Sequence, residues 1–415
     1  MRILFVVHGF PPEQPGVWTY HHAHALAAHH EVCAFVFTPD SERKQFEQWQ
    51  YLDGPVLVWR FNNVHINHLR GFANPEIDAI FDYALEYFKP DVVHFEHLIG
   101  LSATMLTRTY RRTIPSVLAL YDYYWVCPRI NLVRGDYSLC PGPSHAFDCV
   151  TCIEGPGDPP PAPRRPGDSL PDVTPGSPTT IRSVASTVDD PPVVPWHLML
   201  HDYRLGSMRV LLDYPDVITA CSDSLRDDLT EMTGLPPGHI RTVSLGLPPL
   251  SQPVERTPSE RVRIRYLGSI LPHKGIHVLA EAATLLTDLP VEIHLHGAGE
   301  PKYLEEIRSR SAAIVHHAPY QHDQLAGILS ETDIVVLPTL SRETFSFVIR
   351  EAAQAGVPVV ASRLGSIPEY IRDGESGLLV PPGSVEALAA ALRRLVTDAD
   401  LRARLAAAAA PIRSR

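Results

Sequence analysis

Residues 341–362 read SRETFSFVIREAAQAGVPVVAS, and this stretch decides the fold. An apolar run at Ile334–Leu337 precedes it, a helical pattern covers Phe347–Ala355, and a second apolar run follows at Val357–Ala361. Two short strands joined by a helix of this length form a crossover connection, which places the strands parallel in one sheet. Their nearly continuous Val and Ile content is typical of a sheet that helices cover on both faces.

Two glutamates in this stretch, Glu343 and Glu351, lie eight residues apart across the junction between loop and helix. If the helix starts near Phe345, its free backbone N–H groups and positive dipole end form an anion site. A phosphate there would have one carboxylate on either side, and carboxylates are suited to binding hydroxyl groups. The alternative is that Glu343 only caps the helix and that Glu351 is exposed. The spacing alone leaves both interpretations open.

The same alternation of strands and helices continues through the second half of the chain. The further predicted strands are Val262–Leu267, Val291–His296, Ile314–His316 and Gly377–Val380. The further predicted helices are Gly275–Leu286, Pro301–Ser309, His322–Ser330 and Val385–Leu395.

The first 120 residues show the pattern as well. The predicted strands are Ile3–Val7, Val32–Phe37, Val56–Phe61, Val92–Phe95 and Ser116–Leu120, with helices at Trp18–Ala28, Ile77–Phe88 and Ser102–Tyr110.

The predicted fold class is therefore α/β, with two doubly wound parallel-sheet domains that face a central cleft. We place an N-terminal domain at residues 1–247, a C-terminal domain at 259–400, and a short helix and tail at 401–415. Residues 154–195 hold about a dozen prolines and are predicted to be a flexible or partly ordered insertion. A helical pattern resumes at His197–Leu212.

Length and charge exclude several classes of protein. With 415 residues the chain exceeds the roughly 250–300 residues at which one core stops growing, so two domains are expected. A net charge of -11 argues against a nucleic-acid binder. The apolar run at the N-terminus is too short for a signal peptide, and no run approaches the roughly 20 apolar residues of a membrane helix. These features predict a cytoplasmic protein with reduced cysteines.

Four of the six cysteines, Cys127, Cys140, Cys149 and Cys152, form one cluster in the sequence. The spacing of the last two is that of structural zinc knuckles, and four thiolates complete a tetrahedral shell. We predict a structural zinc ion here. Unliganded thiols, a redox pair at Cys149 and Cys152, or an iron–sulfur centre remain open. Cys33 and Cys221 are interpreted as core residues of strands.

Two glycine-bearing strand ends complete the pattern of the second half. Residues 266–275 read YLGSILPHKG and residues 295–300 read LHGAGE. Together with residues 341–362 and the GSIPE run at 365–369, they resemble the donor-binding half of the retaining GT-B glycosyltransferases, a group that includes bacterial mannosyl- and glucosyltransferases. The resemblance covers almost all of residues 259–400.

This resemblance assigns roles to individual residues. Lys274 would contact the donor diphosphate, Glu343 the sugar hydroxyls and Glu351 the ribose hydroxyls, and Tyr320 would lie near the base. Gly297 and the backbone of Phe345, Ser346 and Phe347 would complete the donor site. One position departs from the family, which commonly has an arginine where this chain has Ser269. A single cation at the diphosphate is expected unless another domain supplies a second.

The N-terminal half resembles the family less closely. Gly16 lies where the family has its glycine-rich loop, with Pro15 in place of a second glycine. His97 ends a strand at the cleft and is predicted to contact the transferred sugar, whereas His94 is interpreted as a structural residue at the strand end. Glu96 occupies a position where relatives often have histidine. Tyr121-Asp122 stands where relatives tend to have His-Asp.

The predicted function is a retaining, metal-independent transfer of a hexose from a UDP- or GDP-sugar, with His97, Glu343 and Lys274 as the catalytic residues. No cofactor is required for catalysis. The acceptor is an unidentified sugar, lipid-linked compound or small molecule, and weak peripheral contact with a membrane is left open. The competing hypotheses are a nucleotide-sugar epimerase or phosphorylase, and a non-catalytic protein that binds a sugar or a partner.

Overall fold

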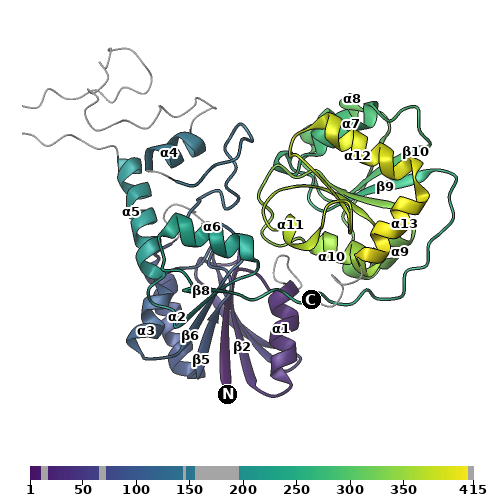
Figure 1. The fold of residues 1–415 in the computed structure, drawn as a ribbon. Helices are drawn as coiled ribbons and strands as arrows, with labels where there is room; N and C mark the ends of the chain where they lie inside the picture. Colours follow the sequence, from purple (N-terminus) through teal and green to yellow (C-terminus); the bar gives the residue numbers. More distant parts are fainter. Residues whose placement is uncertain (11–16, 65–71, 144–145, 155–195, 410–415) are drawn as a thin grey trace, which may run out of the picture.

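The structure is a computed structural model that describes residues 1–10, 17–64, 72–143, 146–154 and 196–409. Two α/β domains lie side by side, the purple-to-teal N-terminal domain and the green-to-yellow C-terminal domain (Figure 1). The predicted Gly16 and most of the proline-rich insertion at 154–195 fall outside the described residues.

The N-terminal sheet has eight strands among the described residues, in the order β3-β4-β2-β1-β5-β6-β7-β8. In chain order the strands are β1 Arg2–Val7, β2 Glu31–Thr38, β3 Gln48–Asp53, β4 Val56–Asn62, β5 Val92–Phe95, β6 Ser116–Leu120, β7 Val217–Ala220 and β8 Ile240–Thr242. The helices are α1 Val17–Ala27, α2 Pro75–Phe88, α3 Met105–Arg111, α4 Ala146–Glu154, α5 Trp196–Leu211 and α6 Asp223–Thr233.

The C-terminal sheet has six described strands, all parallel, in the order β11-β10-β9-β12-β13-β14. They are β9 Val262–Leu267, β10 Val291–His296, β11 Ile314–His317, β12 Ile334–Leu337, β13 Val359–Ser362 and β14 Leu378–Val380. The helices are α7 Ile276–Thr284, α8 Pro301–Arg310, α9 Leu325–Ser330, α10 Phe347–Gln354, α11 Ile367–Tyr370, α12 Val385–Thr397 and α13 Ala399–Ala408, with short 3-10 turns at Pro272–Lys274 and His322–Gln324.

Two parallel α/β sheets confirm the predicted fold class, with one exception at an edge. The strand β3 pairs antiparallel with β4, so the N-terminal sheet is not wholly parallel. The sequence prediction missed β3, β7 and β8 and the helices α4, α6 and α11. The strand predicted from Val357 begins at Val359, because the Val357 amide instead donates to the Ala352 carbonyl at the end of α10.

No helix within the described ranges combines the length and the apolar character needed to cross a membrane.

Side chains of the C-terminal domain contact the N-terminal domain directly. Phe345 is 8% exposed and packs into the core cluster of the N-terminal domain. The carboxylate of Glu369 accepts the backbone N–H groups of Asp223 and Ser224 at the start of α6, at 3.2 and 2.6 Å. Arg350 donates to the Leu245 carbonyl. The two domains therefore meet through apolar packing and through hydrogen bonds.

Candidate functional site

The strand order in each sheet reverses at one point, and a parallel sheet binds ligands at the carboxyl ends of the strands beside such a point. The reversal falls between β1 and β5 in the N-terminal sheet and between β9 and β12 in the C-terminal sheet. The segments that follow these strands begin at His8, Glu96, Gly268 and Pro338. The two reversal points locate the candidate site.

On the C-terminal side, the loops after β9 and β12 bring Lys274 and Glu343 together. Lys274 Nζ donates to Glu343 Oε1 at 2.7 Å, and both side chains are mostly buried. The backbone of Glu343 is held by Ser366, whose amide donates to its carbonyl at 2.7 Å. Gly365 makes this approach possible, since a Cβ there would lie 2.3 Å from the Glu343 carbonyl oxygen and its φ is +58°.

The second predicted carboxylate, Glu351, is in a different environment. It lies in the second turn of α10, partly buried, and its side chain forms no hydrogen bond or ion pair within the described part of the chain. Burial raises the pKa of Glu351 to about 7. Its negative charge also helps to raise the pKa of Tyr320, after burial, so the two side chains are neighbours. A half-buried carboxyl without partners is suited to receive hydroxyl donors from a ligand.

The helix α10 begins two residues later than the anion-site hypothesis placed it. Its N-cap is Ser346, whose side chain makes no capping hydrogen bond, and the first helical residue is Phe347. Phe345 therefore precedes the helix, and its ring is buried against the N-terminal domain instead of bordering an open helix end.

The two glycine-bearing strand ends, after β9 and β10, touch backbone to backbone. A Cβ on Gly297 would lie 1.8 Å from the Gly268 carbonyl oxygen, so only glycine fits there. Ser269 is exposed, and its carbonyl accepts the Tyr266 hydroxyl at 2.7 Å. The position that commonly holds an arginine in the resembling family thus faces solvent without a positive charge.

On the N-terminal side, Glu96 is the centre of a buried polar network. It is 1% exposed, and its carboxylate lies 2.9 Å from His94 Nδ1 and 3.8 Å from His22 Nδ1. The Tyr121 hydroxyl donates to the same carboxylate. Burial alone would raise the pKa of Glu96, but these three partners hold it at about 2. Glu96 is therefore a fixed negative charge at this end of the sheet.

His97 does not point a free ring nitrogen into the cleft. The Ile99 amide donates to its Nδ1 at 3.1 Å, so Nε2 carries the hydrogen and donates to Asp122 Oδ2 at 2.7 Å. The ring of His8 lies 4.4 Å from that of His97, and burial, with His97 acting in the same direction, lowers the pKa of His8 to about 3. A hydrogen bond from the His97 ring to a sugar would require one of these contacts to be released.

The structure adds residues to the site that the sequence prediction did not assign. Asp122 pairs with His97, and it could have been found because it follows β6 in the Tyr121-Asp122 pair. Asp228 on α6 accepts both the Tyr123 hydroxyl at 2.6 Å and Arg342 Nη1 at 3.0 Å. No sequence signal marks Asp228, because it is one of several acidic residues on a polar helix.

The cluster of Cys127, Cys140, Cys149 and Cys152 is gathered beside α5. Burial raises the pKa of Cys149 to about 12, and Cys127, Cys140 and Cys152 act in the same direction, which places the four thiols within electrostatic range of one another. The backbone N–H groups of Leu132 and Arg129 donate to the Cys127 sulfur. In the described residues, no group of three or more His, Cys, Asp or Glu side chains is arranged to hold a metal ion.

A buried arginine lies next to this cluster. Arg204 of α5 is completely buried, donates from Nη2 to the Tyr124 carbonyl at 2.7 Å and lies over the Tyr124 ring. Among the described residues, its Nε and Nη1 atoms have no hydrogen-bond partner, and burial lowers the pKa of this guanidinium. A buried cation with two unpaired donors would be stabilised by negative charge on the neighbouring thiols.

The remaining cysteines differ from one another. Cys33 is buried in β2, as predicted. Cys221 follows the end of β7 and is not only a core residue, because its sulfur lies 3.4 Å from the Thr344 carbonyl of the other domain.

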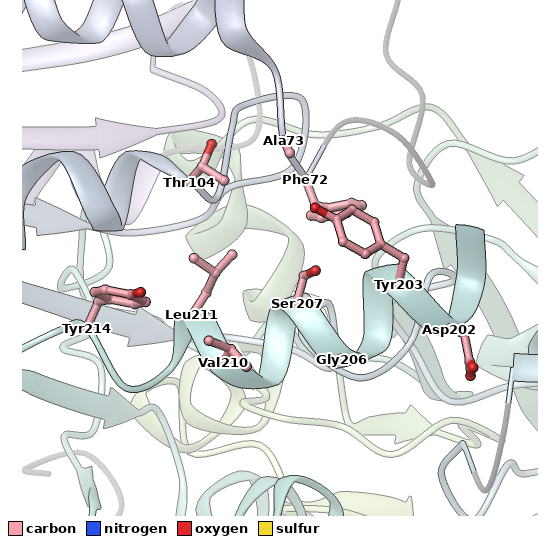
Figure 2. Close-up of a pocket in the computed structure, with 10 residues that line it drawn as sticks. All are labelled: Phe72, Ala73, Thr104, Asp202, Tyr203, Gly206, Ser207, Val210, Leu211 and Tyr214. Carbon is pink, nitrogen blue, oxygen red and sulfur yellow. The ribbon is translucent and has the colours of Figure 1, made fainter. Parts of the chain in front are cut away.

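A separate pocket of about 670 Å³ lies between α5, the segment before α2 and the segment before α3 (Figure 2). None of the predicted site residues lines it. Its lining residues are Phe72, Ala73, Thr104, Asp202, Tyr203, Gly206, Ser207, Val210, Leu211 and Tyr214.

Comparison with known proteins bears on the C-terminal domain first. Residues 261–398 match the family described as "Glycosyl transferases group 1". Over 216 residues the chain is 30% identical to a D-inositol 3-phosphate glycosyltransferase of Arthrobacter sp. (strain FB24), an alignment that covers 49% of this chain and 51% of that protein. It is 34% identical over 197 residues to an MMP alpha-(1->4)-mannosyltransferase of Mycolicibacterium hassiacum, covering 45% and 47%. The chain spans about half the length of the curated relatives it matches.

Comparison of structures covers nearly the whole chain. A sucrose-phosphate synthase of Thermosynechococcus elongatus aligns with a TM-score of 0.69 at 16% identity, over 99% of this chain and 93% of that one. The fold is GT-B. In this GT-B chain Lys274, Glu343 and Glu351 come from the C-terminal domain, and Glu96, His97 and Asp122 come from the N-terminal domain.

Proposed function

We propose that the chain is a glycosyltransferase that moves a hexosyl group from a UDP- or GDP-sugar onto an acceptor, with retention of configuration at the anomeric carbon. The observation that carries the proposal is the half-buried Glu351 beside Tyr320, which has no partner in the described part of the chain and lies in a segment that matches the glycosyl transferases group 1. An isolated carboxyl of this kind lowers the stability of the free protein, so a ligand that donates hydroxyl groups to it explains its presence.

In this mechanism the protein binds and orients the donor and stabilises the departing diphosphate. Glu351 accepts the ribose hydroxyls, and Lys274 exchanges its contact with Glu343 for the diphosphate. Glu343 is then free to accept hydroxyls of the transferred sugar. The backbone N–H groups at the start of α10 add positive potential at the phosphates. The bond from the anomeric carbon to the diphosphate breaks, the acceptor oxygen bonds to that carbon, and the departing phosphate takes the proton of the acceptor hydroxyl, so no dedicated base is required. The positive charges of the protein at the diphosphate take the place of a divalent metal.

We assign no identity to the acceptor. The relatives act on different acceptors by their names, and the N-terminal domain lies outside the segment that matches the family. The buried network at Glu96 and the pair of His97 and Asp122 border this side. We assign His97 to the position of the transferred sugar, through a ring that Asp122 orients.

A panel of nucleotide sugars read by thermal unfolding tests the donor. A ligand present at about 100 times its dissociation constant adds about 2.7 kcal/mol to the free energy of unfolding. We expect stabilisation by one UDP- or GDP-sugar and by the matching diphosphate. If no nucleotide sugar or diphosphate stabilises the protein, the proposal is wrong.

Product analysis with and without acceptors separates the competing functions. A transferase forms a glycosylated product only when an acceptor is added. An epimerase would convert the donor sugar without an acceptor, and a binding protein would leave the donor intact under all conditions.

We also propose that the cluster of Cys127, Cys140, Cys149 and Cys152 binds a structural zinc ion. The support is the proximity of the four thiols, the N–H groups that donate to Cys127, and the unpaired Nε and Nη1 of the buried Arg204. Four thiolates around Zn²⁺ carry a net negative charge, which Arg204 would balance. Because the described side chains are not arranged to hold a metal ion, binding requires the thiols to draw together.

Elemental analysis of the purified protein tests this second proposal, and we expect close to one zinc per chain. The variant Cys149→Ser should lose the metal and impair transfer but keep its affinity for UDP or GDP. Cys33→Ser, which changes a buried thiol of β2, is the control and should keep the metal. Metal-free wild-type protein with full activity would reject the proposal.

A further inference from the structure

The proposed diphosphate site has few positive charges of its own. Ser269 is neutral and exposed, and Lys274 is paired with Glu343 at 2.7 Å. Arg342, the cation next to Glu343 in the sequence, has its Nη1 on both carboxylate oxygens of Asp228, at 3.0 and 3.1 Å. A diphosphate carries at least two negative charges, so Lys274 alone leaves it incompletely neutralised.

A tight loop of the N-terminal domain presents another arginine. The loop follows β6 and is closed by hydrogen bonds from the Tyr123 amide to the Ile130 carbonyl and from the Ile130 amide to the Cys127 carbonyl, both at 3.0 Å. Arg129 lies at its tip and is exposed. Its side chain forms no ion pair among those of the described residues, whereas its own backbone amide donates to the Cys127 sulfur.

This loop faces the donor half across the domain boundary. Burial lowers the pKa of His273, and the positive charges of its neighbour Lys274 and of Arg129 lower it further. Arg129 thus acts electrostatically on the turn that carries Lys274.

One carboxylate ties the base of this loop to the C-terminal domain. Asp228 accepts the Tyr123 hydroxyl at 2.6 Å and Arg342 Nη1 at 3.0 Å, and Arg342 directly precedes Glu343, the partner of Lys274. Figure 1 shows this blue segment, which leads into α4, on the side of its domain that faces the C-terminal domain. The position of Arg129 therefore depends on the closed arrangement of both domains.

We propose that Arg129 supplies the second positive charge of the donor diphosphate site, from the opposite domain, in place of the arginine that Ser269 does not provide. The inference rests on the proposed function, since it assumes a nucleotide diphosphate at Lys274. A guanidinium binds phosphate oxygens through two parallel N–H donors, a geometry that a lysine cannot reproduce. Donor binding would then join the two domains through the diphosphate.

Titration calorimetry of UDP, GDP, uridine and guanosine against four proteins tests the inference. They are the wild type, Arg129→Ala, Arg129→Lys and the control Arg134→Ala, which removes an equal charge from the same segment. We expect Arg129→Ala to weaken the preferred diphosphate about tenfold to a hundredfold, because one charge-assisted contact is lost. Arg129→Lys should recover only part of the affinity. Nucleoside affinity should not change, and Arg134→Ala should behave as the wild type.

A compensating variant makes the test specific. In Arg129→Ala/Ser269→Arg the charge returns from the C-terminal domain, and diphosphate affinity should recover at least tenfold. If the wild type binds UDP or GDP and Arg129→Ala binds it equally well, the inference fails and the proposed function stands. If the wild type binds neither diphosphate, both fail.

Discussion

Glu96 and Glu351 are acidic side chains on opposite sides of the domain boundary, and their surroundings differ in one respect. Glu96 has His94, His22 and Tyr121 around it, and its pKa is held at about 2. Glu351 has no partner in the described structure, and burial raises its pKa to about 7. The N-terminal domain therefore supplies the donors that its buried carboxylate needs, whereas the C-terminal domain leaves them to a ligand. We therefore propose that the first arrangement stabilises the free protein and that the second receives a ligand.

The largest effect is expected from removal of the partnered carboxylate. Glu96→Ala leaves the Tyr121 hydroxyl without its acceptor and removes the charge that lies beside two imidazoles, which should lower the free energy of unfolding by about 2–4 kcal/mol. Urea unfolding at pH 7 measures it. Glu96→Gln keeps an acceptor for Tyr121 and should lose less. Equal stability of Glu96→Ala and wild type would show that the network does not stabilise the fold.

Removal of the unpartnered carboxyl should instead change ligand binding. Glu351→Ala loses contacts to two ribose hydroxyls and should weaken UDP or GDP about tenfold to a hundredfold, as one or two charge-assisted hydrogen bonds would. Glu343→Ala should mainly lower turnover. Titration of both diphosphates against the two variants checks the split, with the exposed Glu305→Ala on α8 as the control. Unchanged affinity in Glu351→Ala would remove the ribose assignment.

Although loss of the Glu351 carboxylate should weaken ligand binding, it should stabilise the ligand-free protein. Since the folded-state pKa of Glu351 is raised from 4.5 to about 7, the folded protein holds an extra proton in this window, and stability falls as pH rises through it. At pH 8, Glu351→Gln should therefore raise the free energy of unfolding by about 1–3 kcal/mol. At pH 4 it should have little effect. Thermal unfolding of the ligand-free protein at both values measures the difference, and a loss of stability at pH 8 would contradict it.

The smallest effect is expected at a carboxylate whose partners come from both domains. Asp228 accepts Tyr123 from its own domain and Arg342 from the other. Asp228→Asn should lower the free energy of unfolding by about 0.5–1.5 kcal/mol, because both hydrogen bonds weaken but neither donor is stranded. A double-mutant cycle with Arg342→Ala measures how much of this free energy comes from the Asp228–Arg342 contact across the domain boundary. A coupling of zero would show that Asp228 does not join the domains.

How far the sequence predicted the fold depended on burial. Strands such as Ser116–Leu120 and Ile334–Leu337 were predicted with their observed bounds, because both of their faces are covered and their residues are mostly apolar. The edge strand β3 reads QWQYLD and is largely exposed, so it carries no such signal. Helix α6 was missed for a related reason, since only Leu225 and Leu229 of its residues are buried.

Some residues of the candidate site could be predicted from the sequence and others could not. Lys274, Glu343 and Glu351 follow or border predicted strands, so strand order alone brought them to one edge of the sheet. His94, on β5, precedes Glu96 in the chain, but the other two partners of Glu96 come from α1 and from the residue after β6, and only tertiary packing brings them to it. The roles of His97 and of the donor residues stay predictions, and Gly16 lies outside the described residues.

The thiol of Cys221 gives the domain boundary a chemical reporter. It is 2% exposed, its sulfur lies 3.4 Å from the Thr344 carbonyl, and burial raises its pKa to about 12. Only the thiolate reacts quickly with an alkylating reagent, so the closed protein is protected twice, by shielding and by protonation. We expect modification of Cys221 to become faster when the contact at Thr344 opens. The rate at which a small iodoacetamide labels this one side chain would then count opening events directly, with no added fluorophore.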